Sequence, residues 1–177
     1  MRHKYQVKYK DILLRPLHSS DLENLRQWRN TKAITQYLSP TPYITEQMQT
    51  KWFYNEQKNV ASMTFAICFE NELIGSLAIY NIADKQAEFG KILIGAENKQ
   101  GKGIGFLATV MVLDFAFSKL DLNQINAIVY DENISGKKVF LKAGFSVVEQ
   151  GEELNLVLTK DCFFKTHEFL KEIEVQP

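Results

Sequence analysis

The stretch that decides the fold is Gln100-Gly101-Lys102-Gly103-Ile104-Gly105, in which glycine occupies every second position. It follows the apolar run Ile92-Leu93-Ile94 and leads into a long apolar segment, residues 106–117. This pattern predicts a strand before the glycines and a helix after them. Glycine lets a backbone approach a ligand closely, and the first N–H groups of a helix have no intrahelical partner. The turn is therefore suited to an anion, and we expect a phosphorylated ligand here.

Two common phosphate-binding motifs do not fit this turn. A Walker A loop has four residues between its first glycine and its Gly-Lys pair, followed by Ser or Thr. Here five residues separate Gly95 from Gly101, and Gly103 stands where the magnesium-binding hydroxyl is needed. A dinucleotide fingerprint requires a third glycine at the position of Phe106. The alternative that these glycines only make a tight turn with close helix packing stays open at this point.

The segments around the turn alternate between strand-like and helix-like patterns. In the strand at 87–94, alternation predicts Glu88, Gly90, Ile92 and Ile94 on one face of the sheet and the residues between them on the other. The element order predicts an α+β fold with βα units in its second half, not a doubly wound one. The expected strands are 12–17, 63–69, 73–80, 87–94, 125–130, 146–148 and 154–158. Two helices are expected to begin near Ser19 and Thr45, and three more are expected at 106–117, 133–142 and 166–173. A loop is expected at 39–42.

Size and composition indicate one ordinary globular domain over residues 1–177. Hydrophobic residues make up 45% and charged residues 24%, which excludes a disordered chain. The formal net charge of +0 gives no general attraction to nucleic acid or to an anionic membrane, so we expect neither as a partner. Cys68 and Cys162 lie far apart, with no metal or disulfide spacing. The N-terminus lacks the apolar core of a signal peptide, and we expect a cytoplasmic protein.

Two blocks of the sequence resemble one known family. Gln100-x-x-Gly103-x-Gly105 is similar to the acetyl-coenzyme A signature of the GNAT superfamily of N-acetyltransferases. The resemblance covers residues 12 to about 158. A second block lies where that family has Asn, Ser, Tyr, Lys, Gly and Phe: it consists of Asn133, Gly136, Phe140, Lys142, Gly144 and Phe145.

Within the superfamily, the segments 12–17, 28–30 and 120–123 are similar to a bacterial branch. That branch holds the ribosomal-protein alanine acetyltransferases, the spermidine acetyltransferases and the enzymes that acetylate amino sugars on nucleotide carriers. Trp28-Arg29-Asn30 is slightly closer to the amino-sugar members.

The resemblance implies αβα layers: a mixed, mostly antiparallel sheet of about seven strands, splayed at the cofactor site and flanked by helices. It implies acetyl-CoA as cofactor, whose pantetheine pairs like an added strand with Ile92, Leu93 and Ile94. Asn133 is expected to bond the cofactor arm and Phe140 to lie beside it. Lys142 is expected to meet a phosphate, with a solvated helix residue as the alternative. The pyrophosphate is expected to bind the backbone amides of Gln100, Gly101, Lys102, Gly103, Ile104 and Gly105.

Acetyl transfer to an amine needs a base and a proton for the departing thiolate. Glu88 is the candidate base, acting through water, because many members of the family carry a carboxylate there; a solvated strand carboxylate is the alternative. Phe140 stands where many members have the tyrosine that protonates the thiolate, so that acid is absent. Tyr130 or water is the expected substitute, although Tyr130 also fits a packed strand aromatic. We expect no metal, because no cluster has ligand spacing.

The acceptor pocket is expected between residues 28 and 53, with Arg29, Tyr37 and Tyr43 as its candidate binding residues. The sequence thus predicts transfer of an acetyl group from acetyl-CoA to a primary amine, directly within a ternary complex. The amine is left open among an amino sugar, a polyamine and a protein N-terminus. Phe140 motivates an alternative, a non-catalytic acyl-CoA-binding sensor or interaction module. A longer acyl group and a homodimer through an exposed strand edge also stay open.

Overall fold

A computed structural model describes residues 3–37, 42–167 and 172–177 of the chain. Its strands form one sheet in the order β7-β8-β6-β5-β4-β3-β2-β1-β9. The pair β5–β6 is parallel, and the other pairs in the described residues are antiparallel. The strands are β1 (Gln6–Tyr9), β2 (Ile12–Pro16), β3 (Ser62–Phe69), β4 (Glu72–Ala83), β5 (Gln86–Ile94), β6 (Gln124–Tyr130), β7 (Ser146–Gln150), β8 (Glu153–Thr159) and β9 (Glu174–Gln176).

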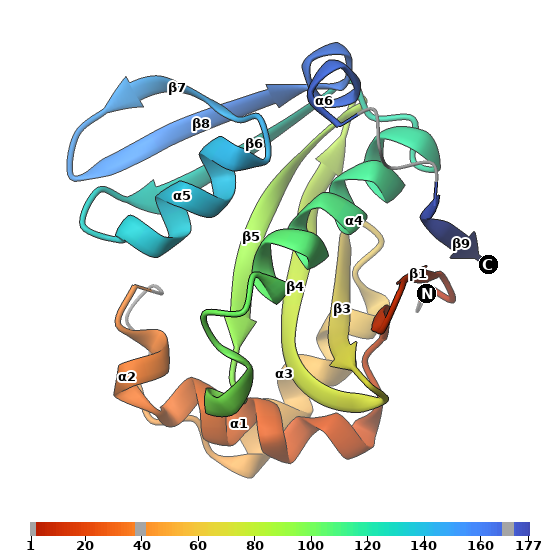
Figure 1. Cartoon of the computed structure of the whole chain (residues 1–177). Helices are drawn as coiled ribbons and strands as arrows, with labels where there is room; N and C mark the ends of the chain where they lie inside the picture. The colour runs from red at the N-terminus through yellow and green to blue at the C-terminus, as the bar shows by residue number, and fades with distance from the viewer. Residues whose placement is uncertain (1–2, 38–41, 168–171) are drawn as a thin grey trace.

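Helices cover both faces of this sheet. In Figure 1, α4 (Ile104–Ser118) crosses the front of β3, β4 and β5, while α1 (Leu22–Asn30) and α3 (Glu46–Lys58) lie on the opposite side. Ten residues of α4 are buried, as its apolar sequence predicts, because the sheet covers one side of the helix and neighbouring segments cover others. The remaining helices are α2 (Lys32–Thr35), α5 (Ile134–Lys142), α6 (Lys160–Thr166) and the 3-10 turns η1 (Ser19–Asp21) and η2 (Glu97–Lys99).

The mixed, mostly antiparallel sheet confirms the predicted fold class, with two strands more than expected. The additional strands are β1 and β9, which pair with each other at the edge of the sheet. A helix not predicted from the sequence, α6, begins directly after β8, where the Thr159 hydroxyl accepts from the backbone N–H of Cys162 and caps it. Residues 168–171 of the helix expected at 166–173 lie outside the described residues. Residues 39–41 of the expected loop lie outside the described residues.

The sheet opens between β5 and β6. These strands pair only at Gln86, Ala87 and Glu88 of β5. Beyond Glu88 the strands diverge, and β6 turns away toward α5 (Figure 1). The expected splay next to residues 92–94 is therefore present, and this side of the β5 backbone is left without a strand partner.

A β-bulge in β5 changes which side chains share a face. Gly90 opposes Ala78 but Leu93 opposes Ser76, so two residues of β5, at Lys91 and Ile92, face one residue of β4. Lys91 has φ 52°, which accommodates the extra residue. Glu88 and Gly90 share a face as predicted, but Ile92 and Ile94 pack on the α4 side with Phe89. Placing Ile92 and Ile94 with Glu88 was wrong, because strict alternation does not hold across a bulge.

Candidate active site

The glycine turn leads directly into the N-terminus of α4. Gly101 has φ 72° and Gly103, the N-cap residue, has φ 78°, both in the left-handed region that favours glycine. A Cβ at either position would meet no atom within 4 Å, so the space above the turn is open. The first bond of α4 runs from the N–H of Leu107 to the oxygen of Gly103, 3.1 Å away. The N–H groups of Ile104 and Gly105 are therefore available to an anion.

Two side chains hold this turn against the sheet. The Gln100 amide donates to the carbonyl oxygen of Ile94 at 2.8 Å, which ties the turn to the end of β5. The Lys99 ammonium lies 3.0 Å from the Glu70 carboxylate in the β3–β4 turn and 4.6 Å from the centroid of the Phe69 ring. Gln100 thus acts through its side chain, and its backbone N–H donates to the carbonyl oxygen of Glu97 at 3.2 Å. Lys102 is exposed, with no ion-pair partner in the described part of the chain.

The second sequence block lies beside the same helix end. The Lys142 ammonium is 4.2 Å from the centroid of the Phe106 ring, which belongs to the first turn of α4. Lys142 therefore reaches the turn from α5, as its predicted role requires. The side-chain oxygen Oδ1 of Asn133 accepts from the N–H of Gly136 at 2.8 Å and caps α5. A Cβ on Gly136 would lie 2.5 Å from Nδ2 of Asn133, so a side chain there would require that amide to shift.

Phe140 is a core residue at the edge of the splay. It is 4% exposed, and its ring lies edge-on to Phe89 of β5 at 5.7 Å and to Phe145 at 5.3 Å. These contacts hold α5 against β5 next to the point where β5 and β6 separate. Phe140 therefore contributes packing at this position and has no proton to donate.

Glu88 has two neighbours on β4, neither of which was predicted from the sequence. Tyr80 is the cross-strand partner of Glu88. The side-chain amide of Asn81 donates to Glu88 Oε1 at 2.8 Å. Burial, and then the charge of Glu88, raises the pKa of Tyr80 to about 12. The Tyr80 hydroxyl therefore keeps its proton at neutral pH beside the Glu88 carboxylate.

The same tyrosine borders the β5 bulge. The Tyr80 hydroxyl would lie 3.2 Å from a Cβ on Gly90, and the Lys91 ammonium lies 4.1 Å from the centroid of the Tyr80 ring. Glycine at position 90 thus leaves room for the tyrosine. The pairing of β4 with β5 brings Tyr80 opposite Glu88 only because the register shifts between Tyr80 and Ala83.

Tyr130 lies at the far end of β6. It is four residues beyond Asn126, the partner of Glu88, which corresponds to about 13 Å at roughly 3.3 Å per residue. Its carbonyl oxygen accepts from the N–H of Asn133. The structure thus places Tyr130 near the cap of α5, and Tyr80 is the hydroxyl beside Glu88.

The acceptor candidates occupy different environments. Arg29 of α1 is half-buried, with its guanidinium carbon 5.7 Å from the centroid of the Trp52 ring, and burial lowers its pKa. Tyr43 is 69% exposed and contacts Arg26 at 3.2 Å. Tyr37 is half-buried just after α2. The structure therefore brings Arg29 to α3 and leaves Tyr43 on the surface.

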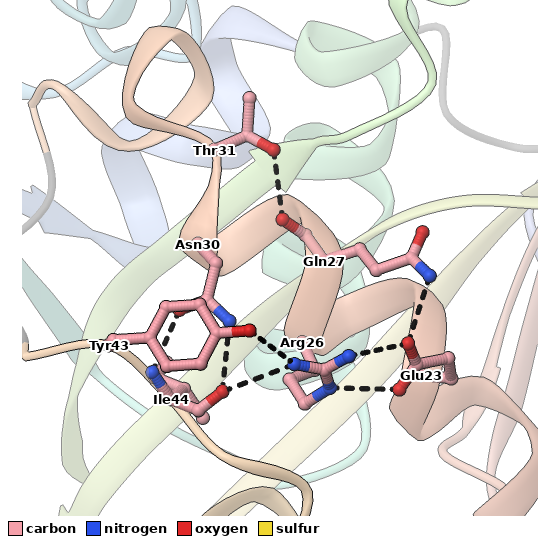
Figure 2. A network of polar contacts seen from close by, with 7 residues as sticks. All are labelled: Glu23, Arg26, Gln27, Asn30, Thr31, Tyr43 and Ile44. Carbon is pink, nitrogen blue, oxygen red and sulfur yellow. Dashed lines mark hydrogen bonds and ion pairs between the residues drawn. The ribbon is translucent and has the colours of Figure 1, made fainter.

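A polar network fixes the chain after residue 41 to α1. Figure 2 shows the Asn30 side chain donating to the carbonyl oxygen of Ile44 at 2.9 Å and accepting from its N–H at 2.8 Å. The same view shows Arg26 bound to Glu23 through two hydrogen bonds, of 2.7 and 2.8 Å. The two Asn30 bonds, together with the donation from Arg26 to the carbonyl oxygen of Ile44 at 3.4 Å, fix the entry to α3 relative to α1.

The described residues contain no group of three His, Cys, Asp or Glu side chains suited to a metal ion. In the same ranges, no helix has the length and apolar content needed to span a membrane.

Comparison with known proteins gives consistent matches. Residues 11–146 match the family model described as the acetyltransferase (GNAT) domain. The chain is 25% identical over 148 residues to the acetyltransferase PseH of Campylobacter jejuni, covering 82% of this chain and 91% of that protein. It is 27% identical over 171 residues to spermidine N(1)-acetyltransferase of Escherichia coli, covering 91% and 89%. The solved spermidine N-acetyltransferase of Vibrio cholerae, in complex with CoA and spermine, has a TM-score of 0.79 at 22% identity, covering 88% of this chain and 99% of that one.

Proposed function

Because this chain belongs to the acetyltransferase (GNAT) domain family, it is an acetyl-CoA-dependent N-acetyltransferase, and we propose that Glu88 prepares its primary amine for direct attack on the thioester. One observation carries the proposal: the splay beside β5 starts at Glu88 and leads toward the glycine turn. A single extended cofactor then reaches both places. The alternative of a non-catalytic binding module receives no support from the family match.

The proposed cofactor position follows from the open backbone groups. The pyrophosphate binds at the turn, where the N–H groups of Ile104 and Gly105 are open and the Lys142 ammonium lies over the Phe106 ring. The exposed Lys102 belongs to the same turn and adds a second positive charge. The pantetheine arm runs through the splay and pairs with the free side of β5. The thioester then lies between Glu88 on one face of the sheet and Phe140 on the other.

The proposed reaction moves two protons from the amine nitrogen. The ammonium form first gives a proton through water to Glu88, and the free amine attacks the thioester carbon. The tetrahedral intermediate then loses its second N–H proton as the C–S bond breaks, and that proton passes through water to the thiolate. A thiolate whose conjugate acid has a pKa of about 8.5 leaves without a strong acid, so Phe140 at the usual acid position is tolerated. Tyr80 positions the Glu88 carboxylate throughout.

Binding of the cofactor is tested by thermal unfolding with acetyl-CoA. A ligand at 100 times its Kd stabilises the folded state by about 2.7 kcal/mol. For a chain of this size that is roughly a 5–10 °C rise in Tm. Pantetheine, which lacks the pyrophosphate, serves as control and is expected to give little shift. No shift with millimolar acetyl-CoA would contradict the assignment.

The glycine turn supplies a prediction on affinity. Gly103→Ala puts a Cβ on a residue with φ 78°, which costs roughly 1–2 kcal/mol or turns the backbone away from this conformation. Either response misdirects the N–H groups of the first helical turn, so we expect the Kd for acetyl-CoA to rise about tenfold in calorimetric titration. Gly105→Ala is the matched comparison, since its Cβ makes only an ordinary 3.7 Å contact with Ile94. Equal affinities for the two variants would refute the role of Gly103.

Three further expectations stay proposals. We place the enzyme in the cytoplasm, because Cys68 and Cys162 are both free thiols, as a reducing compartment keeps them. One sheet joins strands from both ends of the chain, which supports a single domain over 1–177. A homodimer is expected to use the edge of β7, which is exposed along its whole length, and light scattering tests it. Nucleic acid and membranes are not expected as partners.

A further inference from the structure

The arginines that the structure describes differ in their partners. Arg15 is bound to Asp21 at 2.7 Å, and Arg26 to Glu23 at 2.7 Å. Arg29 has no ion pair and no hydrogen bond with any residue in the ranges 3–37, 42–167 and 172–177. Its contact is with the face of the Trp52 ring. Arg29 is therefore a half-buried positive charge that the described chain does not balance.

Such a charge is costly unless something neutralises it. Desolvation lowers the pKa of Arg29, and no carboxylate counteracts the effect. Because a guanidinium presents its N–H donors in a planar fork, it binds carboxylate and phosphate groups through two bonds at once. Stacking on Trp52 holds that fork in place.

A second unsatisfied polar group lies on the same side of α3. Gln49 is 1% exposed, and neither its side-chain nitrogen nor its side-chain oxygen has a partner in the described residues. It precedes Trp52 by three residues, so the two side chains are neighbours on the helix surface. The junction of α1 and α3 therefore offers a guanidinium, an aromatic ring and a buried amide, all with unused binding capacity.

This junction lies on the Glu88 side of the sheet. Trp28 and Trp52 both pack against the smaller apolar cluster, on the face opposite α4. The Trp28 ring occupies the space that a Cβ on Gly95 would need, which places the end of α1 at the end of β5. Gly95 lies seven positions after Glu88, or roughly 20 Å along the strand, before the reach of the side chains is subtracted. A small molecule of moderate length spans that interval.

We propose that the acceptor amine belongs to an anionic molecule, whose phosphate or carboxylate group binds Arg29 over Trp52. This inference rests on the proposed function and specifies its substrate class. A polyamine carries positive charge on every nitrogen, and it would place that charge beside an unpaired guanidinium. An anionic acceptor instead neutralises Arg29 while its amine reaches Glu88.

The test compares matched acceptors on the full chain with saturating acetyl-CoA. Glucosamine 6-phosphate and muramic acid supply a phosphate and a carboxylate, glucosamine supplies neither, and spermidine represents polyamines. UDP is added as a competitor that has no primary amine. At least one anionic probe is expected to be turned over or to compete with the acceptor. Arg29→Gln is expected to weaken that probe's kcat/KM or inhibition constant roughly 10- to 100-fold.

The controls separate this inference from the proposed function. Lys32→Gln removes an exposed positive charge three residues away on α2, and it is expected to leave the effect of the anionic probe unchanged. Arg29→Lys is expected to recover part of the loss, because it keeps the charge without the fork. The inference would be overturned if the enzyme acetylated glucosamine or spermidine equally well with and without Arg29→Gln, and if no anionic probe had an effect at millimolar concentration. The proposed function would still stand. Absence of turnover with every amine tested would overturn both.

Discussion

Glu88→Gln is expected to lower kcat by roughly 10²- to 10⁴-fold, the usual contribution of a positioned general base. Glutamine keeps the shape of the side chain and an oxygen that accepts from Asn81, but it cannot take up a proton at neutral pH. The proposed binding site for the pyrophosphate lies at the other end of the splay, so the Kd for acetyl-CoA is expected to stay within about twofold of the wild type, measured by calorimetry. Steady-state thiol release gives kcat.

Two further variants show whether the effect belongs to Glu88 itself. Glu153→Gln removes an exposed carboxylate at the start of β8 and is expected to leave kcat unchanged. Tyr80→Phe removes only the hydroxyl beside Glu88, so a loss of about tenfold is expected, smaller than that of Glu88→Gln. A Glu88→Gln enzyme with full turnover would remove Glu88 from the mechanism.

Gly75→Ala is expected to cause the largest loss of stability, about 3 kcal/mol. A Cβ at Gly75 would overlap the carbonyl oxygen of Leu93, a backbone atom that no side-chain rotation moves away. Gly75 is also the cross-strand partner of Ile94, so β4 and β5 must separate to accommodate the methyl group. For a chain of this size the expected fall in Tm is roughly 6–12 °C by calorimetry.

The same change is expected to weaken acetyl-CoA binding, because displacing Leu93 and Ile94 moves the strand with which the pantetheine is proposed to pair. Gly151→Ala is the control: its Cβ would have its nearest neighbour at 3.8 Å, the carbonyl oxygen of Glu153, and a change within about 0.5 kcal/mol is expected. A Gly75→Ala protein as stable as Gly151→Ala would show that the β4–β5 contact is looser than described.

Features set by local sequence were predictable. The helix at 104–118 follows from glycines at its start and apolar residues all round, and the hairpin at 62–83 follows from two apolar runs around Glu70-Asn71. Both depend on residues close together in the chain. The cofactor turn belongs to the same class, because left-handed backbone at Gly101 and Gly103 is what glycine favours.

Features set by register were not predictable. The bulge at Lys91 places a lysine at positive φ, which no sequence period indicates, and it reverses the faces of Ile92 and Ile94. The contact of Tyr80 with Glu88 depends on a second irregularity, between Tyr80 and Ala83 of β4. The strands β1 and β9 were missed because each is short and is stabilised by pairing with the distant end of the chain.

Thiol release from acetyl-CoA, followed across a panel of amines with the acetylated product identified by mass spectrometry, tests the central claim most directly. The panel contains amino sugars with and without phosphate, spermidine and N-terminal peptides. The structure predicts stoichiometric thiol and N-acetylated amine with at least one acceptor, and loss of both with Glu88→Gln. The claim would be contradicted if the protein bound acetyl-CoA but no acceptor raised the rate of thiol release above the rate measured without amine. That result would identify the chain as a non-catalytic acyl-CoA-binding module.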